Sequence, residues 1–394
     1  MQILDTMERF LCIAGSARGH QFLRQCAELG VRPTLLTLDG LRDAAWPQEV
    51  VEDLATMPAG LSREQVLNTV SWMARGRRFN RVVALDETDL LRAAEIREHM
   101  RIPGMGITTA GYYRDRLAMR VSARESGFAA SEFCRVLNYD DLREFMERVP
   151  APWHLGPRTR TAGEQREQIE SPEHLWRVLE RLGDRQSHFV LEKVIEGERF
   201  IVESIISECR VVFSVVLRQS CLGKFDKPGG ARLTETVDRT SLDWMELTAL
   251  NGGVGPSLGM VRGVTHASFV HCAADGRYYF EEIAAGIGHA GEDELVEAAS
   301  GLNLWREWAR LETAHLRGET YVPQEWFENY AASLEWAEGG VGVDVPELRA
   351  AEVVSVVERQ GMQRAVIRSA RLEKVSGLVQ KLCARLEEHS LVVG

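Results

Sequence analysis

Residues 189–198 read Phe-Val-Leu-Glu-Lys-Val-Ile-Glu-Gly-Glu, an apolar run that passes directly into an acidic turn containing glycine. The run predicts a buried strand at Phe189–Glu192, and Glu196–Glu198 predicts a turn. After this turn, Ile201–Ile206 and Val211–Leu217 alternate apolar and polar residues on either side of a second polar turn. Such alternation predicts an antiparallel pair of strands.

Downstream, the same kind of pattern recurs. Val264–Val270 and Tyr278–Ile283 predict a hairpin around Asp275-Gly276, and a glycine-rich stretch at Asn251–Gly259 precedes it. From Gln324 onward the pattern is mixed. The tail contains a predicted short strand at Ala365–Ile367 and a predicted helix at Leu372–Glu388.

Upstream, strands alternate with helices. Phe10–Ala14, Pro33–Asp39 and Arg81–Asp86 are apolar runs that predict buried strands, and Phe22–Leu29 has the periodicity of an amphipathic helix. Gly15–Gly19 predicts a tight strand-to-helix turn, since the full dinucleotide fingerprint is absent. This alternation predicts a small doubly wound, mostly parallel sheet. The segments between this sheet and residue 189 are a helical stretch from Tyr113, helices at Asp141–Val149 and Glu173–Leu182, and a strand at Pro152–Pro157.

Composition and charge exclude several classes of protein. The chain has 394 residues and a formal net charge of −11, which argues against nucleic acid as a partner because phosphate binding needs a basic face. No apolar run is long enough to span a membrane, and Met1–Arg9 lacks the features of a secretory signal. The seven cysteines have no zinc or thioredoxin-type spacing. We therefore expect reduced thiols and a cytoplasmic protein with neither nucleic-acid nor membrane partners.

The order of segments from Arg81 to Glu312 resembles the ATP-grasp superfamily, in particular its carboxylate–amine ligases. Residues 189–198 are similar to the family's hinge for adenine and ribose, and residues 263–283 are similar to the strand pair that carries its metal ligands. Residues 301–305 resemble its closing helix. The resemblance implies ATP and Mg²⁺ as cofactors and an acyl phosphate made from a small carboxylate, an amino acid or a peptide.

The resemblance also implies a combined α/β and α+β architecture. A doubly wound N-terminal domain of the pre-ATP-grasp type would precede an ATP-grasp fold of two α+β subdomains and a small C-terminal α/β element. The expected boundaries are residues 1–112, 113–188, 189–315 and 316–394.

Several residues that the resemblance assigns to the nucleotide depart from the family pattern. Arg116 stands at the first phosphate lysine, where arginine keeps the charge but not the compact ammonium. Gly156 stands at the second and brings no charge, although Arg158 lies close by. The hinge residues implied to bind nucleotide are Glu192, Lys193, Ile195 and Glu198. The loop that covers the phosphates corresponds to Thr159–Glu167, which is bulky and acidic here.

Most of the implied metal-ligand positions also lack the family's ligand residue. Glu282 stands at one carboxylate position, but Ser268 replaces another and Ala284 replaces a polar ligand, while Gly286 stands where the family often has arginine. Strand alternation places Glu281 on the opposite face, so that only a shift of register would let it substitute. Further cleft candidates are Arg218, His266 and His289, with the acidic run Glu292–Glu294 expected to begin a helix.

These losses leave three hypotheses open. The first is a protein related to carboxylate–amine ligases whose usual catalysis is impaired, and the second is a pseudoenzyme or binding module with at most weak nucleotide binding. The third is an active ligase with compensating residues. The N-terminal domain and the C-terminal helix each offer a face on which a homodimer can form.

Overall fold

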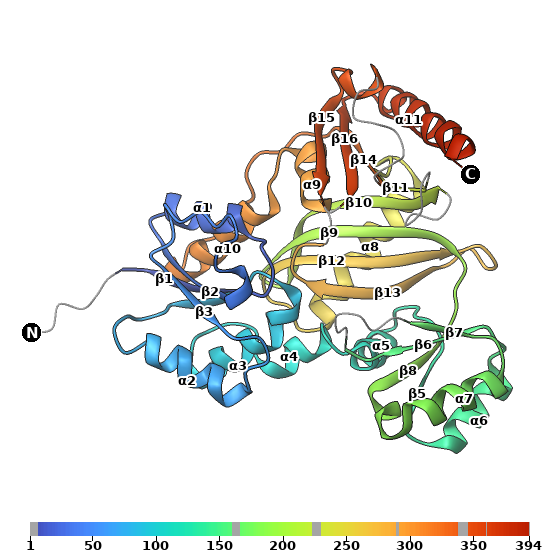
Figure 1. Cartoon of the computed structure of the whole chain (residues 1–394), viewed down its shortest axis with the longest axis horizontal. Helices are drawn as coiled ribbons and strands as arrows, with labels where there is room; N and C mark the ends of the chain where they lie inside the picture. Colours follow the sequence, from blue (N-terminus) through green and yellow to red (C-terminus); the bar gives the residue numbers. More distant parts are fainter. Residues whose placement is uncertain are drawn as a thin grey trace, which may run out of the picture.

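The computed structural model describes residues 7–159, 166–222, 230–288, 291–337, 346–359 and 361–393, and within these ranges the chain forms three β-sheets (Figure 1). In Figure 1 the N-terminal unit lies on the left, the small sheet at lower right and the large sheet in the centre. The short 3₁₀ helices are η1 (Asp39–Leu41), η2 (Glu87–Asp89), η3 (Gly183–His188) and η4 (Pro346–Arg349).

The N-terminal unit is a parallel four-stranded sheet in the order β3-β2-β1-β4. Its strands are β1 (Arg9–Ala14), β2 (Arg32–Leu38), β3 (Asp53–Met57) and β4 (Arg81–Ala84), and its helices are α1 (His20–Glu28), α2 (Arg63–Met73) and α3 (Leu90–Met100). The three predicted strands are confirmed. The sequence did not predict β3, because most of this edge strand is only partly buried and lacks an apolar run.

The small sheet is antiparallel, in the order β5-β8-β6-β7. Its unit contains α4 (Ile107–Tyr112), α5 (Arg116–Glu125), β5 (Phe133–Arg135), α6 (Tyr139–Arg148), β6 (Trp153–Pro157), β7 (Glu167–Ile169), α7 (Pro172–Leu182) and β8 (Phe189–Lys193). Trp153, Leu175 and Leu191 anchor its core. Because β8 pairs with β5 and β6, the small sheet extends past the predicted boundary at residue 188.

The large sheet has eight strands in the order β13-β12-β9-β10-β11-β14-β16-β15. They are β9 (Gly197–Ser207), β10 (Arg210–Leu222), β11 (Ala231–Thr236), β12 (Gly263–Cys272), β13 (Tyr278–Ala285), β14 (Tyr330–Ala337), β15 (Val353–Arg359) and β16 (Met362–Ser369). The accompanying helices are α8 (Leu242–Ser257), α9 (Glu292–Ser300), α10 (Leu304–Arg317) and α11 (Leu372–Val393). Both predicted hairpins are confirmed, and much of the glycine-rich stretch forms the end of α8. The C-terminal strands continue the same sheet instead of forming a separate element.

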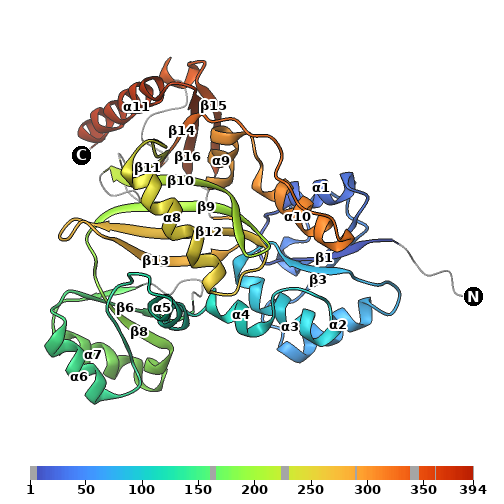
Figure 2. The ribbon, with the colours of Figure 1, turned by 180° about the vertical axis from the view of Figure 1, so that it is seen from behind.

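Strand β9 lies inside the large sheet and divides its two faces. Phe200 and Val202 pack with Val254 of α8 on one face of the sheet. In Figure 2, α8 lies in front of this face. Ile201 and Ile205 belong to a different core on the other face, shared with α9 and α10. The period of two along β9 therefore decides which side chains face the small sheet.

Helix α10 attaches the N-terminal unit to the large sheet. Trp308 packs against Phe22 of α1, with ring centroids 5.4 Å apart in an edge-to-face arrangement. Both rings belong to one hydrophobic core that also contains Ile205 and Val264 of the large sheet. The two units therefore share buried apolar surface and do not sit on a flexible linker.

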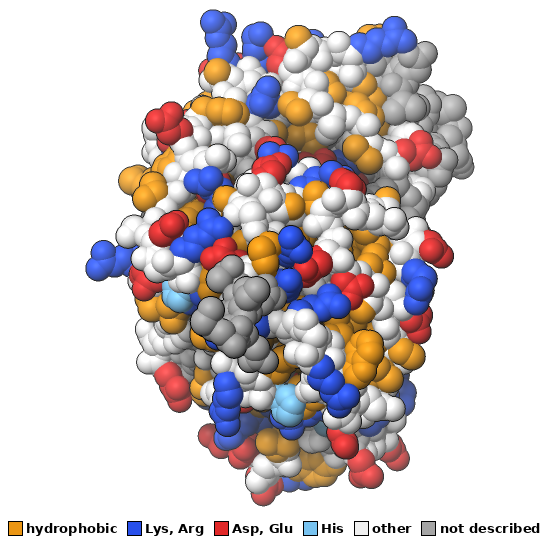
Figure 3. All heavy atoms as spheres, turned by 90° about the vertical axis from the view of Figure 1, so that its left-hand side faces the viewer, with side chains coloured by type: hydrophobic (Ala, Val, Ile, Leu, Met, Phe, Trp, Pro, Cys, Tyr) orange, Lys and Arg blue, Asp and Glu red, His pale blue; other side chains and the backbone are white. Residues whose placement is uncertain are grey.

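On the face drawn in Figure 3, acidic and basic side chains are interspersed among apolar ones. The net charge is therefore not gathered into a single acidic patch on the described part of this face. Among the described residues, no helix has both the length and the apolar character needed to cross a membrane.

A close backbone crossing at Gly197 fixes the passage from the hinge into β9. A Cβ atom at residue 197 would lie 1.9 Å from the carbonyl oxygen of His271 and 3.1 Å from Cα of Cys272. These contacts are with backbone of the neighbouring strand β12, to which β9 is hydrogen-bonded at this point, so no side-chain rotation can relieve them.

We predict that Gly197→Ala lowers the free energy of unfolding by about 1–3 kcal/mol, the usual cost of overpacking, as measured by urea denaturation. Gly252→Ala is the matched control, since its Cβ would meet no atom within 4 Å. Because Gly252 lies in α8, we expect the control to be stabilised by about 0.5–1 kcal/mol. Equal stability of the two variants would contradict the role given to Gly197.

Candidate functional site

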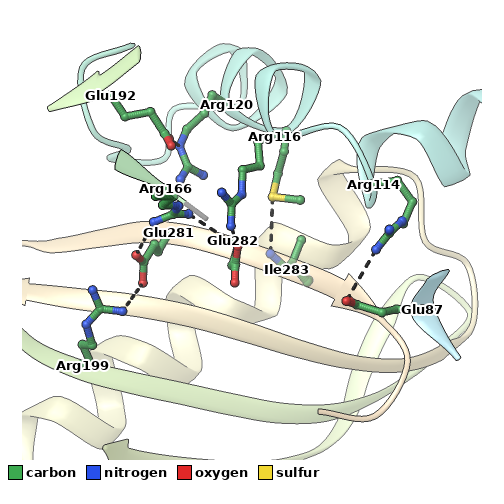
Figure 4. A network of polar contacts seen from close by, with 11 residues as sticks. Glu87, Arg114, Arg116, Arg120, Arg166, Glu192, Arg199, Glu281, Glu282 and Ile283 are labelled. Carbon is green, nitrogen blue, oxygen red and sulfur yellow. Dashed lines mark hydrogen bonds and ion pairs between the residues drawn. The ribbon is translucent and has the colours of Figure 1, made fainter. Parts of the chain in front are cut away.

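A polar cleft of about 460 Å³ lies between the small and the large sheet. Arginine and glutamate side chains from both sheets and from α5 point toward one another there, as Figure 4 shows. The described lining residues are Arg116, His154, Pro157, Arg166, Arg199, Phe200, Ile201, Gln219, His266, Ser268, Glu281, Glu282 and Glu292. We call this space the inter-sheet cleft.

Arg116 enters the cleft from the first turn of α5. The Asp115 side chain caps this helix by accepting hydrogen bonds from the backbone of Leu117 and Ala118, and it is also ion-paired with Arg158. Arg116 Nη2 lies 2.9 Å from Glu282 Oε2, and both side chains are largely buried. The cation at the first lysine position is thus paired with the carboxylate at the predicted metal position, while Arg158 holds the helix cap.

Arg166 occupies the space that Gly156 leaves open. A Cβ atom at residue 156 would lie 2.9 Å from Arg166 Cγ and 3.4 Å from Arg116 Nη1. The guanidinium reaches across the cleft, with Nη1 3.2 Å from Glu281 Oε1 and Nη2 3.7 Å from Glu282 Oε2. Burial opposes its charge, but the surrounding carboxylates outweigh burial and raise the pKa of Arg166 above its ordinary value.

A β-bulge brings Glu281 to the same side as Glu282, which corrects the prediction from strand alternation. Ser268 pairs with Glu282 and the next residue, Phe269, pairs with Phe280, so Glu281 is the extra residue on β13. Such a bulge rotates the strand locally. Both carboxylates therefore line the cleft, and Arg199 Nη1 lies 3.5 Å from Glu281 Oε2.

Glu192 forms a buried ion pair beside the cleft. Its Oε1 atom lies 2.7 Å from Nε of Arg120, with side-chain exposures of 5% and 2%. Burial opposes ionisation of Glu192, but Arg120 and then Arg166 and Arg116 lower its pKa below the ordinary value. In this arrangement the predicted nucleotide-binding glutamate neutralises an arginine of α5.

Three further groups gather at the α9 end of the cleft. His266 Nδ1 lies 2.6 Å from Oε1 of the fully buried Glu203, and one ligand-type atom from each of Glu203, His266 and Glu292 lies within 4.8 Å of the others. Although burial opposes charging, Glu203, Glu292 and Glu282 raise the pKa of His266 to about 9. A protonated imidazole between carboxylates therefore accounts for this group. Helix α9 begins at Glu292, as predicted.

Two candidates are placed away from the cleft. Glu198 and Arg218 are not among its lining residues, whereas the adjacent Arg199 and Gln219 are. Arg218 pairs with Phe200 across the two strands and forms an ion pair of 2.6 Å with Glu235. Neither Glu198 nor Arg218 is therefore among the described side chains that meet in the cleft.

The hinge also opens toward a different space. Lys193 and Ile195 line a cavity of about 780 Å³ with Phe128, Pro152 and Tyr279, and it shares no lining residue with the inter-sheet cleft. Lys193 Nζ donates a hydrogen bond to the Pro150 carbonyl oxygen. Lys193 and Ile195 therefore face a different cavity from Arg116, whereas the hinge residue Glu192 lies beside the inter-sheet cleft. His289 and residues 160–165 of the covering loop lie outside the described residues.

Sequence reasoning did not predict Arg120, Arg166, Arg199 or Glu203 as members of this site. One signal existed for Arg120, since it follows Arg116 by four residues and such residues share one helix face. Arg166 had no such signal, because its position over Gly156 depends on the path of the preceding loop.

Comparisons with known proteins support the architecture. No family model matches the chain. It is similar to the L-arginine-specific L-amino acid ligase of Bacillus subtilis, with 23% identity over 235 residues, which span 58% of this chain and 56% of that protein. The chain therefore spans little more than half the length of this curated relative.

Solved structures match over nearly the whole chain. The L-amino acid ligase from Bacillus licheniformis has a TM-score of 0.72 at 17% identity, covering 96% of this chain and 97% of its own. An ADP complex of N5-carboxyaminoimidazole ribonucleotide synthetase has a TM-score of 0.72 at 14% identity, covering 97% and 98%. The biotin carboxylase domain of Hydrogenobacter thermophilus 2-oxoglutarate carboxylase, in complex with MgADP and bicarbonate, has a TM-score of 0.69 at 12% identity. This match covers 95% of this chain and 89% of that chain. The predicted ATP-grasp fold is confirmed.

We predict that protonation of His266 makes stability depend on pH. A pKa raised from 6.5 to about 9 stabilises the folded state fully below about pH 6.5, and this contribution is lost as the pH rises through about 9. Relative to His266→Gln, the native protein should lose about 2–3 kcal/mol of unfolding free energy between about pH 6 and pH 10. Urea denaturation of both proteins at the two pH values measures this difference.

The control is His271→Gln, farther along the same strand and outside the cleft lining. This control should follow the pH dependence of the native protein. If His266→Gln shows the native pH dependence as well, His266 is not the titrating group.

Proposed function

We propose that this protein keeps the architecture of an ATP-grasp carboxylate–amine ligase but carries out the usual Mg²⁺- and ATP-dependent ligation poorly or not at all. The observation that supports this proposal most directly is the 2.9 Å ion pair between Arg116 and Glu282. The phosphate-binding cation and the magnesium-binding carboxylate of such a ligase here neutralise each other.

The same pairing extends through the cleft. Arg166 and Arg199 are engaged by Glu281, and Arg120 is engaged by Glu192. Before a triphosphate binds, these guanidiniums must leave their carboxylates. The Arg116–Glu282 and Arg120–Glu192 pairs are buried, and removing one partner from a buried pair costs about 3–5 kcal/mol. Nucleotide binding that separates these pairs therefore begins with an unfavourable contribution.

The residues present offer Mg²⁺ no free set of ligands. Mg²⁺ takes oxygen ligands, with one or two carboxylates plus phosphate oxygens. Glu281 and Glu282 are two neighbouring carboxylates, but both are engaged by guanidiniums. Ser268 and Ala284 add no charge. As the side chains lie, the site does not fit magnesium.

The inter-sheet cleft also offers little apolar surface for a nucleobase. Ligand sites for small organic molecules are lined mainly by apolar and aromatic groups. Among the described lining residues, only Pro157, Phe200 and Ile201 have hydrocarbon side chains. Retained nucleotide binding is therefore proposed to be weak. If a substrate is still bound, the likeness to L-amino acid ligases supports an amino acid or a peptide.

A second candidate function is an active ligase with compensating residues. Two observations favour this alternative. Arg166 fills the space next to Gly156, so it can replace the missing lysine. The bulge brings Glu281 beside Glu282, so two carboxylates lie together. In this alternative, Arg116 and Arg166 would hold the phosphates once ATP displaces their carboxylates, and the two glutamates would be released for magnesium. The two candidates make opposite predictions for Arg166.

We expect calorimetric titration with ATP and Mg²⁺ to give a dissociation constant no tighter than about 1 mM, at the weak end of the usual range for enzyme substrates. ADP release in the presence of amino acids and dipeptides should not exceed the background. Binding far below this concentration, with rapid ADP release, would contradict impaired catalysis.

The variant Arg166→Ala separates the two candidates. If the arginine only closes the cleft, its removal should tighten ATP binding, whereas ATP binding and turnover should fall if it replaces the lysine. Arg181→Ala, which removes an exposed arginine of the same unit, is the control and should change neither ATP binding nor turnover.

Because Arg166 blocks a side chain at residue 156, restoration of the ligase residues requires the combination Gly156→Lys, Arg166→Ala and Ser268→Glu. We expect this combination to raise ADP release about 100-fold, as for one restored charge-stabilising group.

A further inference from the structure

A second charged cavity lies where the N-terminal unit meets the large sheet, away from the inter-sheet cleft. Its volume is about 240 Å³, and its walls come from β4, α3, the segment before α4, the start of β12 and α10. It shares no described lining residue with the cleft. We call it the interdomain cavity.

Three arginines with one glutamate dominate its polar lining. Arg262 Nε lies 3.2 Å and Arg81 Nε lies 3.5 Å from Glu312 Oε2, and these three side chains are 6–12% exposed. Arg97, the third arginine, is 9% exposed. The cavity therefore has more guanidinium than carboxylate charge in a place where solvent screens it little.

Arg97 has only backbone acceptors. Its Nε donates to the Val82 carbonyl oxygen at 2.9 Å and its Nη1 to the Met105 carbonyl oxygen at 2.7 Å. Within the described residues, no carboxylate lies within ion-pair distance of it. Burial lowers the pKa of Arg97 to about 10, with Glu312 opposing and Arg262 adding to the effect. The charge of Arg97 is thus held without a counter-ion in contact.

The imidazole of His315 lies between two guanidinium groups, so hydrogen-bond donors outnumber acceptors around it. Its Nδ1 atom lies 3.0 Å from Arg81 Nη2, and its Nε2 atom lies 3.1 Å from Arg262 Nη1. A neutral imidazole has one donor and one acceptor, and a protonated one has two donors. Because guanidinium groups only donate, at most one of the two contacts is a hydrogen bond. The cluster therefore has more N–H groups than acceptors.

Two buried donors in the lining confirm this imbalance. Nε of Arg81 and Nε1 of Trp308 have no hydrogen-bond partner among the described atoms, and both residues line the cavity. Buried donors without partners are uncommon in folded proteins and require a missing acceptor. An oxygen acceptor bound in the cavity can supply a partner for such a donor.

The remaining walls of the cavity are apolar. Their hydrocarbon side chains are those of Val82, Val83, Leu90, Pro103, Met105, Met260, Val261, Val264, Ala285 and Trp308. Inorganic phosphate would leave this surface uncovered, whereas a short organic acid would cover it. A cavity of about 240 Å³ has room for a small branched acid.

We propose that the interdomain cavity binds a small carboxylate with a short apolar body, with Arg97 and Arg81 holding the carboxylate group. The site is separate from the inter-sheet cleft, and its occupation does not depend on ATP. Since the walls come from two units joined through α10, a bound acid stabilises their attachment.

Titration of the full chain with isovalerate tests the proposal. We expect a saturable change in tryptophan fluorescence, because Trp308 lines the cavity, and a rise in Tm. Isovaleramide, which has the same body without the charge, and inorganic phosphate, which has charge without the body, should each bind at least tenfold more weakly. Equal binding of isovaleramide or phosphate would overturn the proposal.

Variants locate the site. Arg97→Met should weaken isovalerate binding at least tenfold, as expected for loss of a charged hydrogen-bond donor, whereas Glu312→Gln should tighten it by removing the competing carboxylate. If Arg97→Met fails to fold, Glu312→Gln still decides the question. Arg63→Gln, on the exposed surface of α2, and Arg116→Met, in the cleft, should bind like the native protein. Loss of binding in Arg116→Met, or no change in Glu312→Gln, would mean that the arginines only join the two units.

Discussion

The requirement that a buried charge be paired governs the space between the two sheets. Arginines from α5, β9 and the segment before β7 meet glutamates from β8 and β13, and each of these groups would be costly to bury alone. Arg116 and Arg166 pair with glutamates of β13 and so join the small unit to the large sheet. The Arg120–Glu192 and Arg199–Glu281 pairs each lie within one unit. The guanidinium groups in this space are thus already engaged by carboxylates.

Local sequence patterns predicted most of the strands and little of this pairing. Phe10–Ala14 and Ile201–Ile206 have clear periodicities, because each strand must bury apolar side chains on a fixed face. The same rule failed at Glu281, since one bulged residue reverses the alternation and leaves no mark in the neighbouring sequence. Glu282 and His266 both line the cleft, and they lie in the part of the two strands that pairs regularly, from Thr265–Ala285 to Ser268–Glu282.

Residues whose role depends on distant segments could not be predicted in this way. Arg166 matters because Gly156, ten residues earlier and on another strand, has no side chain to exclude it. Arg81 and Arg262 meet through Glu312 only after α10 has packed against α1. In both cases the decisive fact is a contact between elements, and a single sequence contains no direct record of such contacts.

The C-terminal strands have a consequence for the integrity of the chain. Strand β14 hydrogen-bonds to β11 from Ala231 to Glu235, so the backbone groups on that side of β11 are satisfied only while residues 330–337 remain attached. Proteolytic loss of the tail would convert β11 into an unprotected sheet edge, and such edges recruit strands from other molecules. The tail thus moves this edge of the large sheet from β11 to β15.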